Sequence, residues 1–121
     1  LFFWGEETDL VLKSLALGGE GAFYDGSVAV LHRVHGNGRA KAEDRFYYQV
    51  RNRMYILKAR FPAGIGFCYR LYYGLKYLRE GACRGWLDIY RRGLGDYFQM
   101  PRQTGCRLTL SRLRKWQTLS K

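Results

Sequence analysis

The chain has 121 residues, of which 47% are hydrophobic, and it carries a formal net charge of +11. This length suits one modest hydrophobic core and excludes two ordinary domains. Aromatic residues are frequent and proline is scarce, which excludes a generally disordered chain. No apolar run approaches the ~20 residues of a membrane-spanning helix, and the acidic start does not resemble a signal peptide.

The charge divides the chain into two regions. Residues 1–44 contain seven acidic and four basic residues, whereas residues 45–121 contain 17 basic and three acidic residues. The net charges are therefore −3 and +14. Such asymmetry in a short chain indicates two regions with different tasks, of which the second is attracted to an anionic surface or polymer.

The first region is expected to contain one helix and a strand. Residues 6–19 favour a short helix that Gly18 and Gly19 end as a C-cap. Residues 22–32 favour a strand pair, or a turn followed by a strand, because a turn sequence precedes a β-branched run. Residues 33–44 are expected to form a polar, glycine-containing loop.

An acidic cluster follows the aromatic run at the start of the chain. Glu6 and Asp9 share one face of the expected helix, whereas Glu7 projects elsewhere. Acids in a first helical turn are favoured as caps and by the helix dipole, which is one interpretation. The other is that a carboxylate beside the aromatic wall of Trp4 acts as a general base or an electrostatic anchor.

His32 and His35 form an H-x-x-H pair at the end of the expected strand. Such a pair is commonly structural, and the alternative is a metal site completed by a nearby carboxylate. The three cysteines are odd in number and widely spaced, which disfavours a disulfide framework or a zinc site. We expect Cys68, Cys83 and Cys106 to be reduced, partly buried packing residues.

The second region is expected to be helical. The pattern predicts a helix over residues 44–61 that ends near Pro62, and a second helix over residues 65–80 that Gly81 ends. A third helix over residues 83–99 is expected to be weak because it contains three glycines. The tail, residues 106–121, is basic and amphipathic.

The helix over residues 65–80 has two different sides. Phe67, Leu71, Leu75 and Leu78 fall on one side, and Tyr69, Tyr72, Tyr73, Lys76 and Tyr77 fall on the other. This division suits either a helix packed on a core or one that lies on a bilayer. The mixture of bases and aromatics is typical of a membrane-surface helix, which we favour, and of a nucleic-acid binder.

In this order, the segments resemble the C-terminal part of a family 2 glycosyltransferase of the bacterial rhamnosyltransferase-like branch. The matching stretches cover roughly residues 1–60 and read FFWGEETDL, LGGEG, DGSVAVLH, HGNGR and FYYQVRNRMYILK; the later RGLGDYFQMPRQTG is also similar. The resemblance implies an α/β fragment that is mostly helical. Residues 1–44 would be the C-terminal part of a GT-A (Rossmann-like) catalytic domain, and residues 45–121 a basic, aromatic-rich set of amphipathic helices.

The resemblance also implies a nucleotide-sugar donor, a divalent metal (Mg or Mn) and displacement at the anomeric carbon with inversion. Glu7 falls at the position of the catalytic base, where Asp is common; Glu6 would support the helix start, and Asp9 would orient it or contact the acceptor. His32 matches a residue near the metal–diphosphate site. Trp4, Arg51 and Asn52 fall on the substrate side, where Arg51 would meet the diphosphate or an anionic lipid acceptor, or would only pin its helix together with Asn52.

Two departures from the family pattern matter. The stretch HRVHGNGR lacks the serine that often follows the histidine, and the 121 residues contain no D-x-D motif to hold metal and diphosphate. We therefore expect an acceptor-side fragment, inactive alone, whose nucleotide-binding half precedes Leu1 and mainly holds the metal.

The expected function is part of an inverting glycosyltransferase that extends a lipid-linked cell-surface polysaccharide. The protein would be cytoplasmic, peripheral at the inner face of the cytoplasmic membrane, and would not bind nucleic acid. The alternative is a small, non-enzymatic basic module that binds nucleic acid or an anionic membrane surface. A third possibility is an interaction domain whose leucine stripe docks on a partner.

Overall fold

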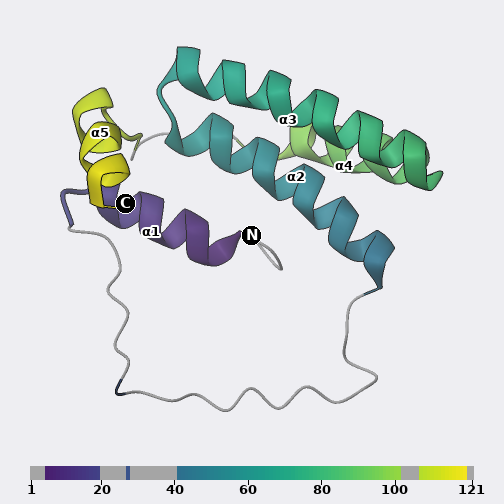
Figure 1. The fold of residues 1–121 in the computed structure, drawn as a ribbon, viewed down its shortest axis with the longest axis horizontal. Helices are drawn as coiled ribbons and strands as arrows, with labels where there is room; N and C mark the ends of the chain where they lie inside the picture. The colour runs from purple at the N-terminus through teal and green to yellow at the C-terminus, as the bar shows by residue number, and fades with distance from the viewer. Residues whose placement is uncertain (1–4, 20–26, 28–40, 102–106, 120–121) are drawn as a thin grey trace.

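The computed structural model describes residues 5–19, 27, 41–101 and 107–119, with the side chains of 115–119 excepted, and the regular elements in these ranges are five α-helices (Figure 1). They are α1 (Glu6–Ala16), α2 (Ala42–Arg60), α3 (Ala63–Arg84), α4 (Leu87–Gln99) and α5 (Leu110–Leu119). The prediction of a mostly helical chain is therefore confirmed for the described residues. The strands expected in residues 22–32 lie outside them, apart from Ser27, which is part of a turn.

The central helix is α2, against which α1, α3 and α4 each pack (Figure 1). It ends at Arg60, and Phe61 is extended directly before Pro62, as a residue before proline prefers. This confirms the predicted end of the helix. At its other end α2 begins at Ala42, so the expected loop over residues 33–44 is wrong for its last three residues. Glu43 and Asp44 favour this earlier start, because acids in a first turn complement the helix dipole.

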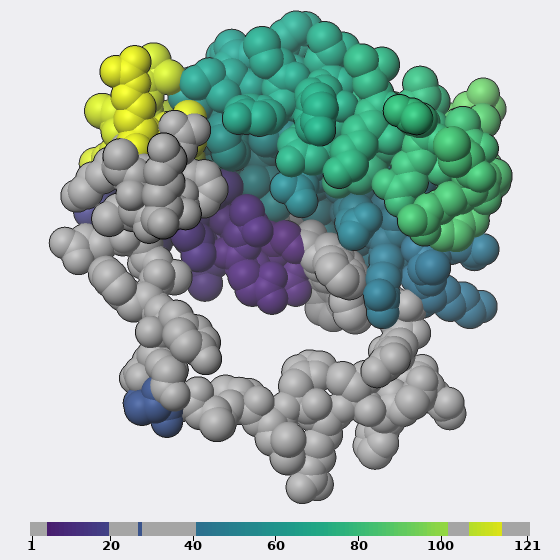
Figure 2. All heavy atoms as spheres, in the orientation of Figure 1, coloured from purple at the N-terminus to yellow at the C-terminus, as the bar shows by residue number. Residues whose placement is uncertain are grey.

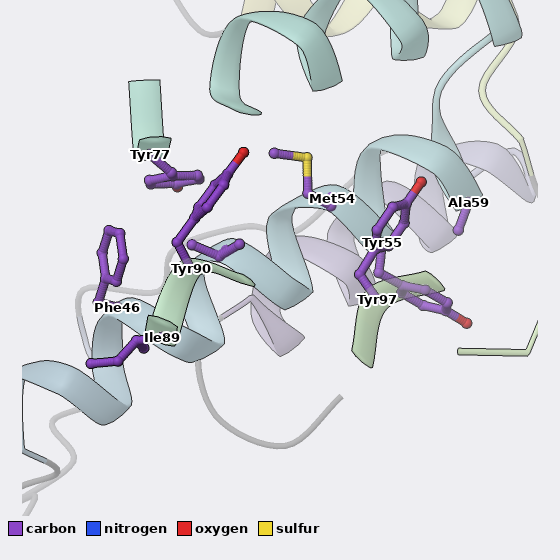
Figure 3. Packing of buried hydrophobic residues seen from close by; sticks show 9 residues of the cluster. Phe46, Met54, Tyr55, Ala59, Tyr77, Ile89, Tyr90 and Tyr97 are labelled. Atoms are coloured by element: carbon purple, nitrogen blue, oxygen red, sulfur yellow. The ribbon is translucent and has the colours of Figure 1, made fainter. Parts of the chain in front are cut away.

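An aromatic core joins α2, α3 and α4 (Figure 3). The Phe46 and Tyr77 rings meet edge to face, with centroids 6.0 Å apart and planes at 86°, a favoured arrangement of aromatic pairs. The Tyr90 hydroxyl donates a hydrogen bond of 3.1 Å to the Gly74 carbonyl, which satisfies a polar group inside this core. We call this cluster the aromatic core; its buried members are Phe46, Val50, Met54, Tyr55, Ala59, Tyr77, Ile89, Tyr90 and Tyr97.

A second, aliphatic core lies where α1 and the segment leading into α5 meet α2. Its buried members are Leu12, Leu15, Ile56, Leu108 and Leu113. The Arg112 guanidinium donates to the carbonyls of Leu15 and Ala16, so it satisfies the C-terminal carbonyls of α1. Gly18 follows α1 with φ of 99°, which confirms the predicted glycine C-cap. We call this cluster the aliphatic core.

Two glycines, Gly93 and Gly81, lie inside helices α4 and α3 where these pack closely on their neighbours. Gly93 lies inside a continuous α4, and a Cβ there would meet the Tyr47 carbonyl oxygen and Val50 at 3.2 Å. The glycines therefore do not interrupt this helix, and Gly93 lets it approach α2 closely. Whether they weaken it stays a prediction. Gly81 does not end α3, since it is helical and buried, with Phe46 and the Trp86 carbonyl within 3.6 Å of a Cβ built there. The helix ends at Gly85, where φ is 70°.

The predicted two sides of α3 exist, and only part of the tyrosine side contributes to the core. Tyr77 is buried there and Tyr73 packs against it, whereas Tyr69 and Tyr72 are 42% and 59% exposed. Tyr77 is 5% exposed, whereas the stripe Phe67, Leu71, Leu75 and Leu78 is 42–60% exposed. The stripe therefore does not pack on the core of the described structure. Cys68 and Cys83 are exposed on the same helix, so the expectation that they are partly buried is wrong. Cys106 lies outside the described residues.

Candidate active site

The start of α1 lies directly against the middle of α2. Gly5, the N-cap residue of α1, has φ of 115°, a conformation that favours glycine. A Cβ at Gly5 would stand 2.8 Å from Ile56 Cδ1 and 3.8 Å from Asn52 Cβ. The glycine therefore allows the acidic turn to sit against Ile56, with Asn52 beside it. In Figure 2 this end of α1 is seen at the surface beside α2.

The three carboxylates of this turn have different surroundings. Glu6 and Glu7 are exposed, whereas Asp9 is half-buried. The N-cap of α1 forms no side-chain hydrogen bond, so the helix start is not closed by a side-chain cap. Because their side chains are exposed, Glu6 and Glu7 are accessible to a molecule that approaches α1 from solvent. The dipole of α1 still favours both charges at this end.

Asp9 forms a two-point ion pair with Arg60, the last residue of α2. Arg60 Nε donates to Asp9 Oδ1 at 2.6 Å, and Nη2 donates to Oδ2 at 3.0 Å. The Arg60 side chain is 1% exposed and the Asp9 side chain 17% exposed, so the pair is largely shielded from water. The Arg60 carbonyl also accepts a hydrogen bond of 2.7 Å from Leu108 N. Because both of its oxygens are occupied, Asp9 is suited to positioning α1.

Arg51 and Asn52 form a polar network beside the acidic turn. Asn52 is fully buried, and its Oδ1 accepts a hydrogen bond of 3.0 Å from Arg51 Nε. The Arg51 guanidinium lies 4.9 Å from the Tyr48 ring centroid and donates to the Tyr47 hydroxyl at 3.4 Å. Arg51 is itself half-buried. It is thus a positive charge held in place on α2 by Asn52, Tyr47 and Tyr48.

The Tyr47 hydroxyl extends this network to α4 by donating a hydrogen bond to Asp96 Oδ2. Burial, followed by the hydrogen bond to Asp96, raises the pKa of Tyr47 above its ordinary value of 10.0. The hydroxyl therefore stays protonated at neutral pH and acts as a donor. Arg92 of α4 lies 4.9 Å from the Tyr47 ring centroid, which adds a cation–π contact.

The structure places Gly5, directly before the acidic turn of Glu6, Glu7 and Asp9, against α2 at Asn52, which binds the Arg51 guanidinium. Trp4 and His32 lie outside the described residues, so their roles stay predictions. Sequence reasoning missed Arg60. The signal that could have found it is the spacing of Asn52, Ile56 and Arg60 by four, which places all three on one side of α2.

The metal that the resemblance implies finds no site among the described residues, where no group of three His, Cys, Asp or Glu side chains is placed to hold an ion. The exposed pair Glu6 and Glu7 does not by itself make a three-ligand set. No mechanistic step is therefore assigned to a metal in this part of the chain.

Among the described helices, none combines the length and the hydropathy needed to cross a membrane. No protein-family model matches the chain, and no curated protein or solved structure matches it either.

Proposed function

We propose that this chain is the acceptor-side, base-carrying part of an inverting family 2 glycosyltransferase. The observation that supports the proposal is the docking of the acidic turn beside Asn52, with Gly5 against Ile56, reinforced by the Asp9–Arg60 pair. The acid motif and the Arg51-Asn52 pair are the two segments on which the family resemblance depends most. They are more than 40 residues apart in the sequence and adjacent in the fold.

In this proposal Glu7 is the general base. Its exposed carboxylate accepts the proton of an acceptor hydroxyl while that oxygen bonds to the anomeric carbon of the donor sugar. The bond between the anomeric carbon and the diphosphate breaks in the same step, and the nucleoside diphosphate leaves with the electron pair. Attack from the opposite side inverts the configuration. Glu6 supports the helix start, and Asp9 orients it through Arg60.

Arg51 is assigned to an anionic group of the donor or the acceptor. Asn52 and the tyrosine rings hold its guanidinium, so little side-chain freedom is lost when it binds a phosphate. The nucleotide and the metal are assigned to a donor-binding half outside the 121 residues, because these lack a D-x-D motif. The chain alone is thus expected to be inactive. The acceptor would be a lipid-linked cell-surface glycan at the inner face of the cytoplasmic membrane.

The substitution Glu7→Gln in the full-length enzyme tests this assignment. We expect the rate of sugar transfer to fall on the order of 10²–10⁴-fold, the contribution typical of a positioned general base, with donor affinity nearly unchanged. Radiolabelled sugar transfer and donor titration measure the two quantities.

The matched control is Glu43→Gln, which removes another exposed acid from a first helical turn, that of α2. It should leave transfer unchanged. Transfer by Glu7→Gln at the wild-type rate would remove Glu7 from the role of base. Retention of the chain on DNA or RNA with a steep salt dependence, together with wild-type transfer by Glu7→Gln, would instead favour the nucleic-acid module.

A further inference from the structure

The exposed surfaces of α3 and α4 carry an unusual number of large apolar side chains. On α3 these are the stripe residues, and on α4 Phe98 is 71% exposed and Leu87 is 36% exposed. Leu94 is half-buried in the same row. Single exposed apolar residues are normal, but a row on each of two neighbouring helices indicates a binding surface.

Contacts between the two helices show that both rows lie on one side of the molecule. Arg70 Nη1 donates to the Tyr97 hydroxyl at 2.9 Å, and Tyr90 bonds the Gly74 carbonyl, so these residues mark where α3 and α4 face each other. Gly66 on α3 and Gly93 on α4 mark the sides that face α2. Successive residues are about 100° apart around a helix. On each helix the side that faces α2 is followed by the side that faces the other helix, and next by the apolar row. Both rows therefore lie on the side away from α2.

We call this surface the outer face. It consists of Phe67, Leu71, Leu75 and Leu78 on α3 and Leu87, Leu94 and Phe98 on α4. The antiparallel pairing of Arg70 with Tyr97 brings the Phe67 end of one row beside the Phe98 end of the other. In Figure 1, α3 lies along one edge of the molecule with α2 beneath it. The outer face is not covered by the described helices, because its members other than Leu94 are 36–71% exposed.

Charge at the border of the outer face indicates what binds it. By helical spacing, exposed Arg79 follows the apolar row on α3 and exposed Arg91 lies beside Leu87 and Leu94 on α4. Each helix thus adds a positive charge to the border of the apolar surface. Asp88 is the acidic residue nearest to this border. An apolar centre with arginines at its rim suits the boundary between the acyl chains and the anionic headgroups of a membrane.

A second copy of the chain fits this surface less well. A two-fold contact through the outer face would bring the arginines of one copy toward those of the other, and like charges that close are unfavourable. Asp88 alone does not balance them. An anionic lipid surface supplies the missing negative charge along the whole border.

We propose that the outer face of α3 and α4 is the surface by which this protein lies on an anionic phospholipid membrane. This assignment deepens the membrane association included in the proposed function, because it names the residues that enter the bilayer interface. It does not depend on sugar transfer. Leu71 and Leu75 would enter the acyl boundary, and Arg79 and Arg91 would meet phosphate groups.

Vesicle sedimentation of the 121-residue chain tests the assignment. The wild type should bind vesicles of equal parts phosphatidylglycerol and phosphatidylcholine, bind phosphatidylcholine alone much more weakly, and release with added salt. The double substitution Leu71→Ser and Leu75→Ser should lower the partition coefficient at least tenfold. Arg79→Gln and Arg91→Gln should each lower it on the order of fivefold, as expected for a basic residue near the surface.

The matched control is Leu10→Ser with Leu17→Ser. Leu10 of α1 and Leu17, the C-cap residue of α1, are 69% and 70% exposed but lie outside the outer face. This variant should bind vesicles like the wild type. Circular dichroism checks that both double variants keep their helices. Equal loss of binding in both, or full binding by the Leu71 and Leu75 variant, would overturn the assignment of the outer face.

A fluorescent label gives a second, independent readout. Cys68 is exposed on α3, near Leu71 and Leu75 by helical spacing, so an environment-sensitive dye there should brighten and shift to the blue when vesicles are added. The same dye at Lys13→Cys, on exposed α1, should not respond. Each protein keeps a single cysteine, with the others replaced by serine.

Two further outcomes would overturn the proposal. The first is the absence of vesicle binding together with a concentration-dependent dimer that Leu71→Ser and Leu75→Ser dissociate, which would assign the outer face to a second copy. The second is an unchanged dye signal at Cys68 while the chain is bound to vesicles. Failure of the catalytic proposal is distinguishable, because Glu7→Gln would then leave transfer intact without affecting vesicle binding.

Discussion

The two cores on either side of α2 are built from different chemistry. The aromatic core joins three helices through tyrosine and phenylalanine rings and through glycines that permit close approach. The aliphatic core has five buried members, and α1 is additionally held there by the Asp9–Arg60 pair. The scaffold α2–α3–α4 thus depends on the fit of its side chains, whereas the placement of the acidic turn depends in addition on a shielded ion pair. The three predictions below separate these two dependences.

The largest effect is expected for Arg60→Met. The substitution leaves the half-buried Asp9 carboxylate without its two-point partner, and breaking a buried pair in this way costs about 3–5 kcal/mol. Urea unfolding of the 121-residue chain measures the loss, and amide exchange should rise in α1 more than in α3 and α4.

The control for this substitution is Arg84→Met, which removes a surface pair with Glu80 on α3 and should cost below about 1 kcal/mol. Combining Arg60→Met with Asp9→Leu should recover most of the loss, because no carboxylate then remains in the shielded site. An effect of Arg60→Met no greater than that of Arg84→Met would show that the ion pair does not hold α1.

A smaller effect is expected from glycine replacements within α4. Gly93→Ala places a Cβ 3.2 Å from the α2 backbone and Val50, and such overpacking costs about 1–3 kcal/mol. Gly95, two residues further on, has nothing within 4 Å of an added Cβ, so Gly95→Ala should stabilise α4 by up to ~1 kcal/mol. Thermal unfolding distinguishes the two directions. Equal shifts for both variants would contradict the close approach of α4 to α2.

The smallest effect is expected from alkaline pH. Burial raises the pKa of Tyr77 in the aromatic core above its ordinary value of 10.0. The unfolded chain therefore loses this proton first as the pH rises. The stability that the neutral hydroxyl contributes is complete below pH 10.0 and falls as the pH rises through the folded pKa.

Tyr77→Phe should make the loss of stability with rising pH less steep above pH 10.0, because the variant lacks this hydroxyl. Urea midpoints measured across the alkaline range give the comparison. The aliphatic core has no buried tyrosine among its described members, so exchange in α1 should respond less. Identical pH profiles for wild type and Tyr77→Phe would contradict the prediction.

The positions of the helices along the chain were predicted better than the faces by which they pack on the core. Helical periodicity, Pro62 and Gly18 located the C-terminal ends of α1 and α2, because these signals act over a few residues. The orientation of α3 was not predicted, since leucines are the usual core residues and tyrosines carry a polar hydroxyl. The informative signal was the row of Gly66, Gly74 and Gly81, which shares a side with Tyr77 and marks the face that approaches other helices.

The candidate site was predicted in part. The acid motif and the Arg51-Asn52 pair were found because each is a compact local pattern. Arg60 was not found, because an arginine in a last helical turn usually interacts with solvent and the helix dipole. Its burial arises only when α1 returns against α2, a contact between segments about 50 residues apart. Whether residues 1–44 and 45–121 have separate tasks stays a prediction.

The position of α2 between α1 and the pair α3 and α4 determines how far Glu7 lies from the outer face. Packed helices have axes about 8–10 Å apart, and α1 lies beside α2 rather than beside the outer face. If the outer face rests on a bilayer, Glu7 stands one or two helix layers from it, on the order of 10–20 Å. An acceptor hydroxyl closer to the membrane than this would be out of reach. If Glu7 is the base, the fold would then favour acceptors whose reactive sugar is held away from the lipid by an intervening linkage.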